Sequence, residues 1–283
     1  MAVSRAVLIT GCSTGIGRAT AERLASRGWR VYATARDVGK IEDLAGRGCA
    51  VLPLDVTDED SMRAAVEEVE RREGTVGVLV NNAGYSQSGA VEGVPMEKVR
   101  RQFETNVFGL VRMCQLVLPG MRRQGWGRIV NISSMGGRLT FPGGGYYHAT
   151  KYAVEALSDA LRFEVAGFGV GVVIVEPGLI RTKFAEAATG SMEGSGPSDG
   201  PYASFDAAVE RAVRNNYERG PFLKLGGGPE TVAATIERAI TVERPRARYA
   251  VTPSAHLFIA LRRLLPDRAW DALVSTVYPQ PRR

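Results

Sequence analysis

Short apolar runs alternate with helical segments along most of this chain, and the alternation limits the fold more than any other feature. The runs, several of them rich in β-branched residues, lie at residues 6–9, 30–35, 50–54, 76–80, 129–132, 171–175 and 247–251. Runs of this length and composition are typical of buried parallel strands. Amphipathic patterns between them predict helices, among them residues 58–72, 96–118 and 229–242. The chain is therefore predicted to be an α/β protein with a doubly wound, parallel, seven-stranded sheet and helices on both faces.

Length and composition place this sheet in an ordinary globular protein. The chain has 283 residues, 45% of them hydrophobic and 23% charged, which fits a single domain over residues 1–283. Its net charge of +6 comes from scattered arginines rather than a basic stripe. A nucleic-acid surface is therefore not expected, whereas an anionic small ligand would account for some of the basic residues.

Cysteine and histidine usage gives no indication of a metal site. The three cysteines lack metal-binding spacing, and two histidines are too few for a zinc site. A sparse, odd cysteine count suggests a reducing compartment. The first strand begins at about residue 6, which leaves no room for a signal peptide, and no apolar run approaches membrane-spanning length. We expect a cytoplasmic protein without a metal or a membrane span.

A glycine-rich turn connects the first apolar run to the first helical pattern. Glycines in this position let backbone N–H groups approach a pyrophosphate, and the following helix N-terminus adds partial positive charge. A plain strand–helix turn also favours glycine, but the strand before and the helix after favour phosphate binding. The candidate cofactor residues in the turn are Gly11, Ser13, Thr14, Gly15, Ile16 and Gly17.

The second strand ends in Arg36 and Asp37. A carboxylate directly at the strand end would repel a 2′-phosphate, whereas a guanidinium can pair with one through two hydrogen bonds. Arg36 therefore favours NADP(H) over NAD(H). The alternative is a solvated Arg36, with Asp37 capping the next helix.

Further candidate cofactor contacts follow the third and fourth strands. Asp55 can accept a hydrogen bond from an adenine amino group, and Val56 can pack on the ring. The small residues after the fourth strand, which allow a flat ligand to lie against the backbone, include Asn82, Ala83 and Gly84. Asn106 lies in the middle of the helix predicted at residues 96–118, where asparagine is slightly unfavourable. A structural hydrogen bond would be the simple explanation.

Tyr147, Lys151 and Ser134 have the chemistry of a proton-transfer site. Ser134 comes where an apolar run ends, and Tyr147 and Lys151 are four residues apart on a predicted helix, so they share one face. A phenol has a pKa of about 10. A nearby ammonium is expected to lower that value, while Ser134 holds a substrate oxygen. Alternatively, the tyrosine and lysine are a surface pair and the serine is a cap.

The pattern weakens after the sixth strand. Residues 190–201 have loop composition, and a helix containing Phe205 is expected after them. Long irregular segments in compact domains often serve as lids. We therefore expect residues 183–228 to form a substrate loop whose apolar side chains, Phe184, Met192, Tyr202 and Phe205, cover an apolar substrate. Residues 254–283 are expected to form a helical tail for packing or oligomerisation.

Taken in order and spacing, these motifs resemble those of the short-chain dehydrogenase/reductase family over about residues 3–251. The matching motifs are Thr10-Gly-x-x-x-Gly15-x-Gly17, Asn81-Asn-Ala-Gly84, Asn106, Ser134, Tyr147-x-x-x-Lys151 and Pro177-Gly178. The resemblance implies a single Rossmann-type NAD(P)-binding domain and an enzyme acting on CH–OH groups.

The resemblance also implies roles for individual residues. Tyr147 would be the acid/base, Lys151 would hold the nicotinamide ribose, Ser134 would position the substrate oxygen, and Asn106 would hold a water that relays protons. Additional cofactor contacts would come from Pro177, Gly178, Ile180 and Thr182. Arg36 is similar to the corresponding residue of NADP-preferring members, although Thr14 replaces the basic residue that some of them carry.

The predicted activity is NADP(H)-dependent interconversion of a ketone or aldehyde with an alcohol. A looser similarity to hydroxysteroid and retinol dehydrogenase-like members does not identify the substrate, and a ketoreductase acting on acyl carriers stays open. A nucleotide-binding sensor or scaffold without chemistry is the competing class, but it would not need all four catalytic residues. The resemblance further implies a homodimer or homotetramer.

Overall fold

The computed structural model describes residues 3–182, 184–192, 200–215, 224–278 and 280–281. These residues contain a seven-stranded sheet in the order β3-β2-β1-β4-β5-β6-β7, with every neighbouring pair parallel. The strands are β1 (Val7–Ile9), β2 (Val31–Ala35), β3 (Cys49–Pro53), β4 (Val78–Asn81), β5 (Gly127–Ile132), β6 (Val170–Pro177) and β7 (Arg248–Val251). The strand order reverses between β1 and β4, and ligands bind outside the strand ends at such a reversal.

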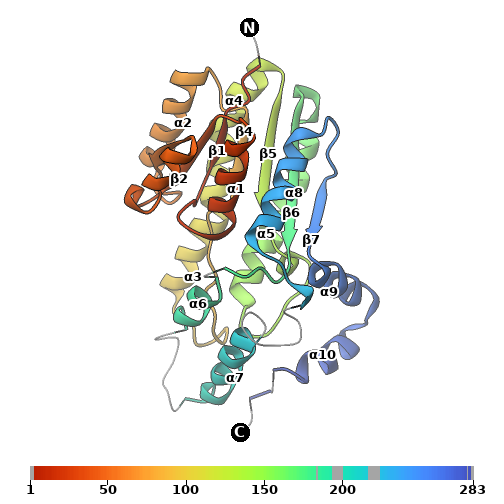
Figure 1. Cartoon of the computed structure of the whole chain (residues 1–283). Helices are drawn as coiled ribbons and strands as arrows, with labels where there is room; N and C mark the ends of the chain where they lie inside the picture. The colour runs from red at the N-terminus through yellow and green to blue at the C-terminus, as the bar shows by residue number, and fades with distance from the viewer. Residues whose placement is uncertain (1–2, 183, 193–199, 216–223, 279, 282–283) are drawn as a thin grey trace.

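Helices cover both faces of the sheet (Figure 1). One face carries α1 (Gly15–Ser26) and α8 (Pro229–Thr241). The other carries α2 (Glu59–Glu73), α4 (Gly109–Gln124) and α5 (Gly145–Glu164). Side chains along β1 alternate between the two cores: Val7 and Ile9 pack with α1 and α8, and Leu8 packs with α2 and α4. The doubly wound, parallel α/β fold is confirmed.

The helix predicted at residues 96–118 is a longer, composite element. It comprises α3 (Met96–Phe103), a π-helical turn at Glu104–Phe108 and α4, and α4 continues past Pro119 to Gln124. The prediction ended too early because proline removes one helical hydrogen bond. The fully buried Met121 anchors the last turn in the core, and Gly125 ends the helix with φ +70°.

In its described residues, the region predicted as a substrate loop contains two α-helices, α6 (Phe184–Gly190) and α7 (Ala203–Arg214). The helix expected around Phe205 is confirmed as α7. The loop prediction was wrong at α6, where seven residues are too few to show a helical period. Both helices lie beyond the carboxyl ends of the strands (Figure 1). Lys183 and residues 193–199 and 216–223 lie outside the described residues.

The helical tail packs beside the same end of the sheet. It consists of α9 (Pro253–Leu264) and α10 (Asp267–Ser275). Phe141, from the loop before α5, has ring-centre distances of 5.9 Å to Phe258, 5.8 Å to Trp270 and 6.2 Å to Tyr278. The tail is therefore joined to the carboxyl-end side of the sheet by an aromatic cluster of these four residues. No helix in the described ranges combines the length and apolar character needed to cross a bilayer.

We predict that Trp270→Ala lowers the free energy of unfolding by about 3 kcal/mol, since a buried aromatic side chain leaves a cavity. Trp270 is buried, whereas Leu273 on the same helix is 41% exposed. Urea unfolding of both alanine variants is the measurement. Equal losses for Trp270→Ala and Leu273→Ala would mean that the aromatic cluster does not hold the tail.

Candidate active site

A single cleft of about 850 Å³ at the carboxyl ends of the strands collects most of the predicted site. Two predicted residues, Gly17 and Asn106, lie behind its wall rather than on it. The predicted residues that line it are Gly11, Ser13, Thr14, Gly15, Ile16, Arg36, Asp55, Val56, Asn82, Ala83, Gly84, Ser134, Tyr147, Lys151, Pro177, Gly178, Ile180 and Thr182. Residues from seven separate stretches of sequence thus meet around one volume.

The glycine turn has the backbone geometry of a phosphate cradle. Gly11 and Gly15 have φ values of +74° and +61°, a region that favours glycine. A Cβ atom at Gly17 would lie 2.4 Å from the Gly11 carbonyl oxygen, so no side chain fits. The N-cap Thr14 makes no side-chain hydrogen bond to α1, whose first turn contains no acidic residue. The α1 N-terminus therefore suits an anionic pyrophosphate.

Thr10 and Asn82 hold this turn against the end of β4. The Thr10 Oγ1 accepts hydrogen bonds from the backbone N–H groups of Asn82 at 3.0 Å and Ala83 at 2.9 Å. The Asn82 Nδ2 donates to the carbonyl oxygens of Thr10 and Gly11, both at 2.9 Å. Asn82 was predicted to contact the cofactor; it lines the cleft and also fixes the turn. The sequence analysis gave Thr10 no role, although its place at the β1 end was a usable signal.

Arg36 and Asp37 at the end of β2 lie in different surroundings. Arg36 is exposed and lines the cleft. Asp37 caps the next short helix (Val38–Lys40) by accepting a hydrogen bond from the Gly39 N–H at 3.1 Å. The carboxylate is thus engaged in a cap, while the guanidinium is available at the cleft rim. Asp55 accepts two hydrogen bonds from Thr57, at 2.9 Å and 2.8 Å.

Helix α5 brings Tyr147 and Lys151 to the cleft, and the end of β5 delivers Ser134. The Lys151 Nζ donates to the Ile132 carbonyl oxygen at 2.8 Å and lies 5.8 Å from the Tyr147 ring centre. The Ser134 side chain hydrogen-bonds the Tyr147 hydroxyl. It also accepts a hydrogen bond from the Gly136 N–H at 3.0 Å. The serine therefore caps this turn, as the alternative expected, and its role in holding a substrate oxygen stays a prediction.

Burial has the largest effect on the pKa values of Tyr147 and Lys151. Tyr147 as a whole is half-buried, but desolvation of its hydroxyl raises its pKa to about 12, against a smaller lowering by the Ser134 hydrogen bond. Desolvation lowers the pKa of Lys151 to about 8, partly offset by Glu155. The pKa of Tyr147 was expected to be lowered and is raised instead, because burial has the largest effect on it. The phenol keeps its proton at neutral pH.

Asn106 makes structural contacts next to the lysine. Its Oδ1 accepts from the Tyr85 N–H at 3.1 Å, and its Nδ2 donates to the Tyr85 carbonyl oxygen at 2.8 Å and to the Thr150 Oγ1 at 3.1 Å. A Cβ at Gly84 would lie 3.1 Å from the Asn106 Oδ1 and 3.8 Å from the Lys151 Nζ. The expected structural hydrogen bond is present, and the π-helical turn around Asn106 is typical of functional sites.

Several cleft-lining residues were not predicted from sequence. They include polar or basic residues of the β4–α3 loop, α3 and the π-helical turn: Tyr85, Gln87, Lys98, Arg101 and Thr105. Lys98 and Arg101 of α3 are three residues apart, a spacing that places both side chains on one helix face. That amphipathic spacing was the available signal. Nothing comparable marked the loop residues.

Helix α6 closes one side of the cleft. Ala187 and Ser191 line it, and Ser191 is held by the Gln87 side chain at 2.7 Å and the Ser88 N–H at 2.9 Å. Met192 and Phe205 pack instead against an apolar cluster that includes Tyr278 of the tail. Tyr202 donates to Glu92 at 2.7 Å. The Phe184 side chain lies outside the described residues.

Comparisons with known proteins agree with this geometry. A profile of short chain dehydrogenases matches residues 5–192. The chain is 37% identical to the NADPH-dependent 3-dehydrocapnine reductase of Ornithobacterium rhinotracheale, with 95% of each chain covered. It is also 37% identical to the 3-ketodihydrosphingosine reductase of Bacteroides thetaiotaomicron, covering 96% of this chain and 97% of the relative. A crystal structure of a short-chain dehydrogenase from Streptomyces avermitilis superposes with a TM-score of 0.79 and 35% identity, covering 96% and 97% of the two chains.

We predict that Gly17→Ala weakens NADPH binding by at least about tenfold, because the new methyl group would displace the Gly11 carbonyl and the Asn82 amide. Gly46→Ala is the control, since a Cβ there has no neighbour within 4 Å. Fluorescence titration with NADPH measures the dissociation constants, and circular dichroism verifies folding. Unchanged affinity in a folded Gly17→Ala protein would contradict the phosphate-cradle assignment.

Proposed function

The chain belongs to the short-chain dehydrogenase/reductase family, and from this premise we propose that it is an NADP(H)-dependent oxidoreductase that interconverts a ketone or aldehyde with an alcohol. The observation that carries the proposal is the convergence of Ser134, Tyr147 and Lys151 in the same cleft as the glycine turn. A dinucleotide fits that cleft because backbone, not side chains, forms the cradle at its phosphate end. A nucleotide-binding sensor or scaffold would not require Ser134, Tyr147 and Lys151 beside the nucleotide.

In the proposed reaction, the nicotinamide supplies or accepts the hydride, and the protein handles the proton. Tyr147 donates its phenolic proton to the developing alkoxide during reduction, since its pKa of about 12 keeps it protonated at neutral pH. Ser134 holds the substrate oxygen through its hydroxyl. Lys151 holds the cofactor ribose and carries positive charge beside the phenol. Asn106 is proposed to hold a water that relays protons to Lys151; its position beside Gly84 supports this role.

We propose NADP(H) as the preferred cofactor. Arg36 lies at the cleft rim with its neighbouring carboxylate occupied in a helix cap, so a 2′-phosphate would meet a guanidinium rather than an acid. The name of the Ornithobacterium relative states NADPH dependence, which agrees with this preference.

We propose a largely apolar keto compound as substrate. The two relatives described above are named for 3-dehydrocapnine and 3-ketodihydrosphingosine, so 3-ketodihydrosphingosine is the first compound to test here. The proposed substrate loop spans residues 183–228. An apolar cluster formed by Val209 and Phe205 of α7 together with Met192 supports its apolar character.

The proposed setting is a cytoplasmic homodimer or homotetramer. Exposed apolar side chains on the π-helical turn and α5, namely Phe108, Tyr152, Leu157 and Phe163, support association through these elements.

NADPH oxidation followed by absorbance tests the function against 3-ketodihydrosphingosine, aliphatic and aromatic ketones, and a 3-ketoacyl carrier substrate. Turnover of the sphingoid ketone supports the proposal, whereas exclusive turnover of the acyl carrier substrate would favour the ketoreductase alternative. Tight NADPH binding without turnover of any compound would favour a sensor.

We predict that Tyr147→Phe lowers kcat at least about a hundredfold, because it removes the proton donor. The dissociation constant for NADPH should stay within about twofold. Tyr152→Phe is the matched control: Tyr152 lies on the same helix, is 44% exposed and does not line the cleft. Near-normal kcat in Tyr147→Phe would refute the acid/base assignment.

We predict that Arg36→Ala lowers the ratio of kcat/KM with NADPH to kcat/KM with NADH by about tenfold, the scale expected for one charge-assisted contact. Arg123→Ala, an exposed arginine that does not line the cleft, should leave the ratio unchanged. If both variants keep the wild-type ratio, another residue selects the cofactor.

A further inference from the structure

The row of side chains that begins at the active site continues along α5 into a buried charge cluster. Tyr147, Lys151, Glu155 and Asp159 are each four residues apart, so they form one ridge of the helix. The first two line the cleft, and Glu155 is buried behind them. Glu155 therefore lies one helical turn from the proposed catalytic ammonium.

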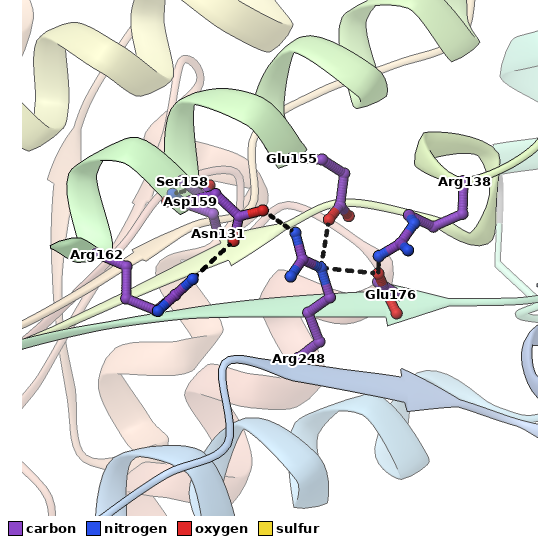
Figure 2. Close-up of polar contacts among 8 residues, drawn as sticks. All are labelled: Asn131, Arg138, Glu155, Ser158, Asp159, Arg162, Glu176 and Arg248. Atoms are coloured by element: carbon purple, nitrogen blue, oxygen red, sulfur yellow. Dashed lines mark hydrogen bonds and ion pairs between the residues drawn. The ribbon is translucent and has the colours of Figure 1, made fainter.

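Arg248 of β7 connects this ridge to β6 (Figure 2). Its Nε lies 2.9 Å from the Glu155 Oε2 and 3.5 Å from the Glu176 Oε1, and its Nη2 bonds Asp159. Arg138 approaches the same Glu176 oxygen from the other side at 3.3 Å. Glu155 and Glu176 are only 7% and 5% exposed at their side chains, whereas Asp159 is 41% exposed. Two buried carboxylates thus share one guanidinium.

The cluster is not a fully satisfied structural ion pair. The Glu155 Oε1 is buried without a hydrogen-bond partner among the described residues. A Cβ at Gly137 would meet the Glu155 Cγ at 2.9 Å, so a glycine makes the room for this side chain. Burying a carboxylate with one unbonded oxygen costs stability. Arg248 therefore engages only one of the two Glu155 carboxylate oxygens.

We propose that Glu155 is a positioning residue for Lys151: its carboxylate offsets the burial of the Lys151 ammonium, and Arg248 fixes that carboxylate in place. This inference rests on the proposed function, in which Lys151 works as a cation. No contact between Glu155 and the cleft is needed, since the carboxylate acts through the charge of the lysine.

Electrostatics of the neighbouring groups support the proposal. Burial lowers the pKa of Lys151 to about 8, and the Glu155 charge is what opposes that fall. Burial and the Glu155 charge raise the pKa of Glu176 to about 7. His148 has a pKa near 4 and Tyr147 one near 12, so neither changes charge close to neutrality. Tyr147 and Glu155 of α5 are the groups next to Lys151, and His148 contacts Tyr147. Asp159, Glu176, Arg138 and Arg248 belong to the cluster around Glu155. The charged residues Arg36, Asp55, Lys98 and Arg101 line the same cleft.

The sign of the effect follows from these shifts. Without the Glu155 charge, desolvation of Lys151 is opposed less, so its pKa falls further and the ammonium is lost at a lower pH. The alkaline limb of kcat/KM for ketone reduction should then move to lower pH. The pKa of Glu176 should also fall, because Glu176 no longer experiences the repulsion of the Glu155 charge.

The test is an NMR titration of the Lys151 ε-carbon in protein labelled with ¹³C-lysine, with the signal assigned by Lys151→Arg. We expect Glu155→Gln to lower the Lys151 pKa by roughly one pH unit, the lower end of effects from a nearby opposite charge. The alkaline limb of kcat/KM should shift by a similar amount, and Glu155→Asp should restore part of both shifts. Glu164→Gln, the same change at an exposed site on the same helix, should alter neither.

A Lys151 pKa that is unchanged in Glu155→Gln would overturn the inference, even if the variant melts at a lower temperature. If Glu155→Gln does not fold, Asp159→Asn replaces it. Its partly exposed carboxylate can be lost without a buried cavity, and Arg248 then neutralises Glu155 more fully, so a smaller downward shift is expected. The absence of that shift would also overturn the inference. If Glu155→Gln lowers the Lys151 pKa as expected but the wild-type protein reduces no ketone, the proposed function is rejected and the inference about Glu155 is not.

Discussion

The hydrogen bonds between Thr10 and the start of the Asn82–Gly84 segment are the contact on which the rest of the site depends. They join the ends of β1 and β4, the two strands between which the sheet order reverses. A parallel sheet places all its carboxyl ends on one side, but the ladder between β1 and β4 ends at Ile9 and Val80 and does not fix the turns that follow the two strands. The threonine hydroxyl and the asparagine amide do so without inserting a side chain into the cradle.

Desolvation is the second organising constraint. The cleft surrounds a phenol and an ammonium with protein, and for both groups it favours the neutral form. For the phenol this preserves a proton to donate. For the Lys151 ammonium it favours loss of the positive charge, and the Glu155 carboxylate on the same helix reduces this effect. One physical effect therefore has opposite consequences for the proposed roles of Tyr147 and Lys151.

The fold could be predicted from sequence because each strand and most helices carry their own periodicity. The strand bounds differ by one or two residues from those expected, and α8 was expected at nearly its observed position. Helix α6 was missed because it is too short to show a period, and the passage of α4 through Pro119 was missed because local propensity opposes it. Tertiary packing around Met121 decides that case.

The candidate site was predictable to the extent that its residues follow strand ends. Residues such as Arg36 and Asp55 meet in the cleft for that reason. Contacts between distant elements, such as those of Arg248 with α5, leave no local pattern and could not be found. The direction of the Tyr147 pKa shift was predicted wrongly, because helical spacing can be read from the sequence whereas desolvation depends on the complete three-dimensional environment.

The aromatic cluster around Phe141 has a consequence for how the tail evolves. Phe141 contacts His148, the residue next to Tyr147, as well as Phe258, Trp270 and Tyr278, and Tyr278 also packs against α7. The last segment of the chain is thus linked through Phe141 to the residue next to Tyr147, although none of these aromatic residues lines the cleft. Sequence changes in these final residues would therefore act on the site through the positions of α5 and α7 rather than by direct contact with a bound molecule.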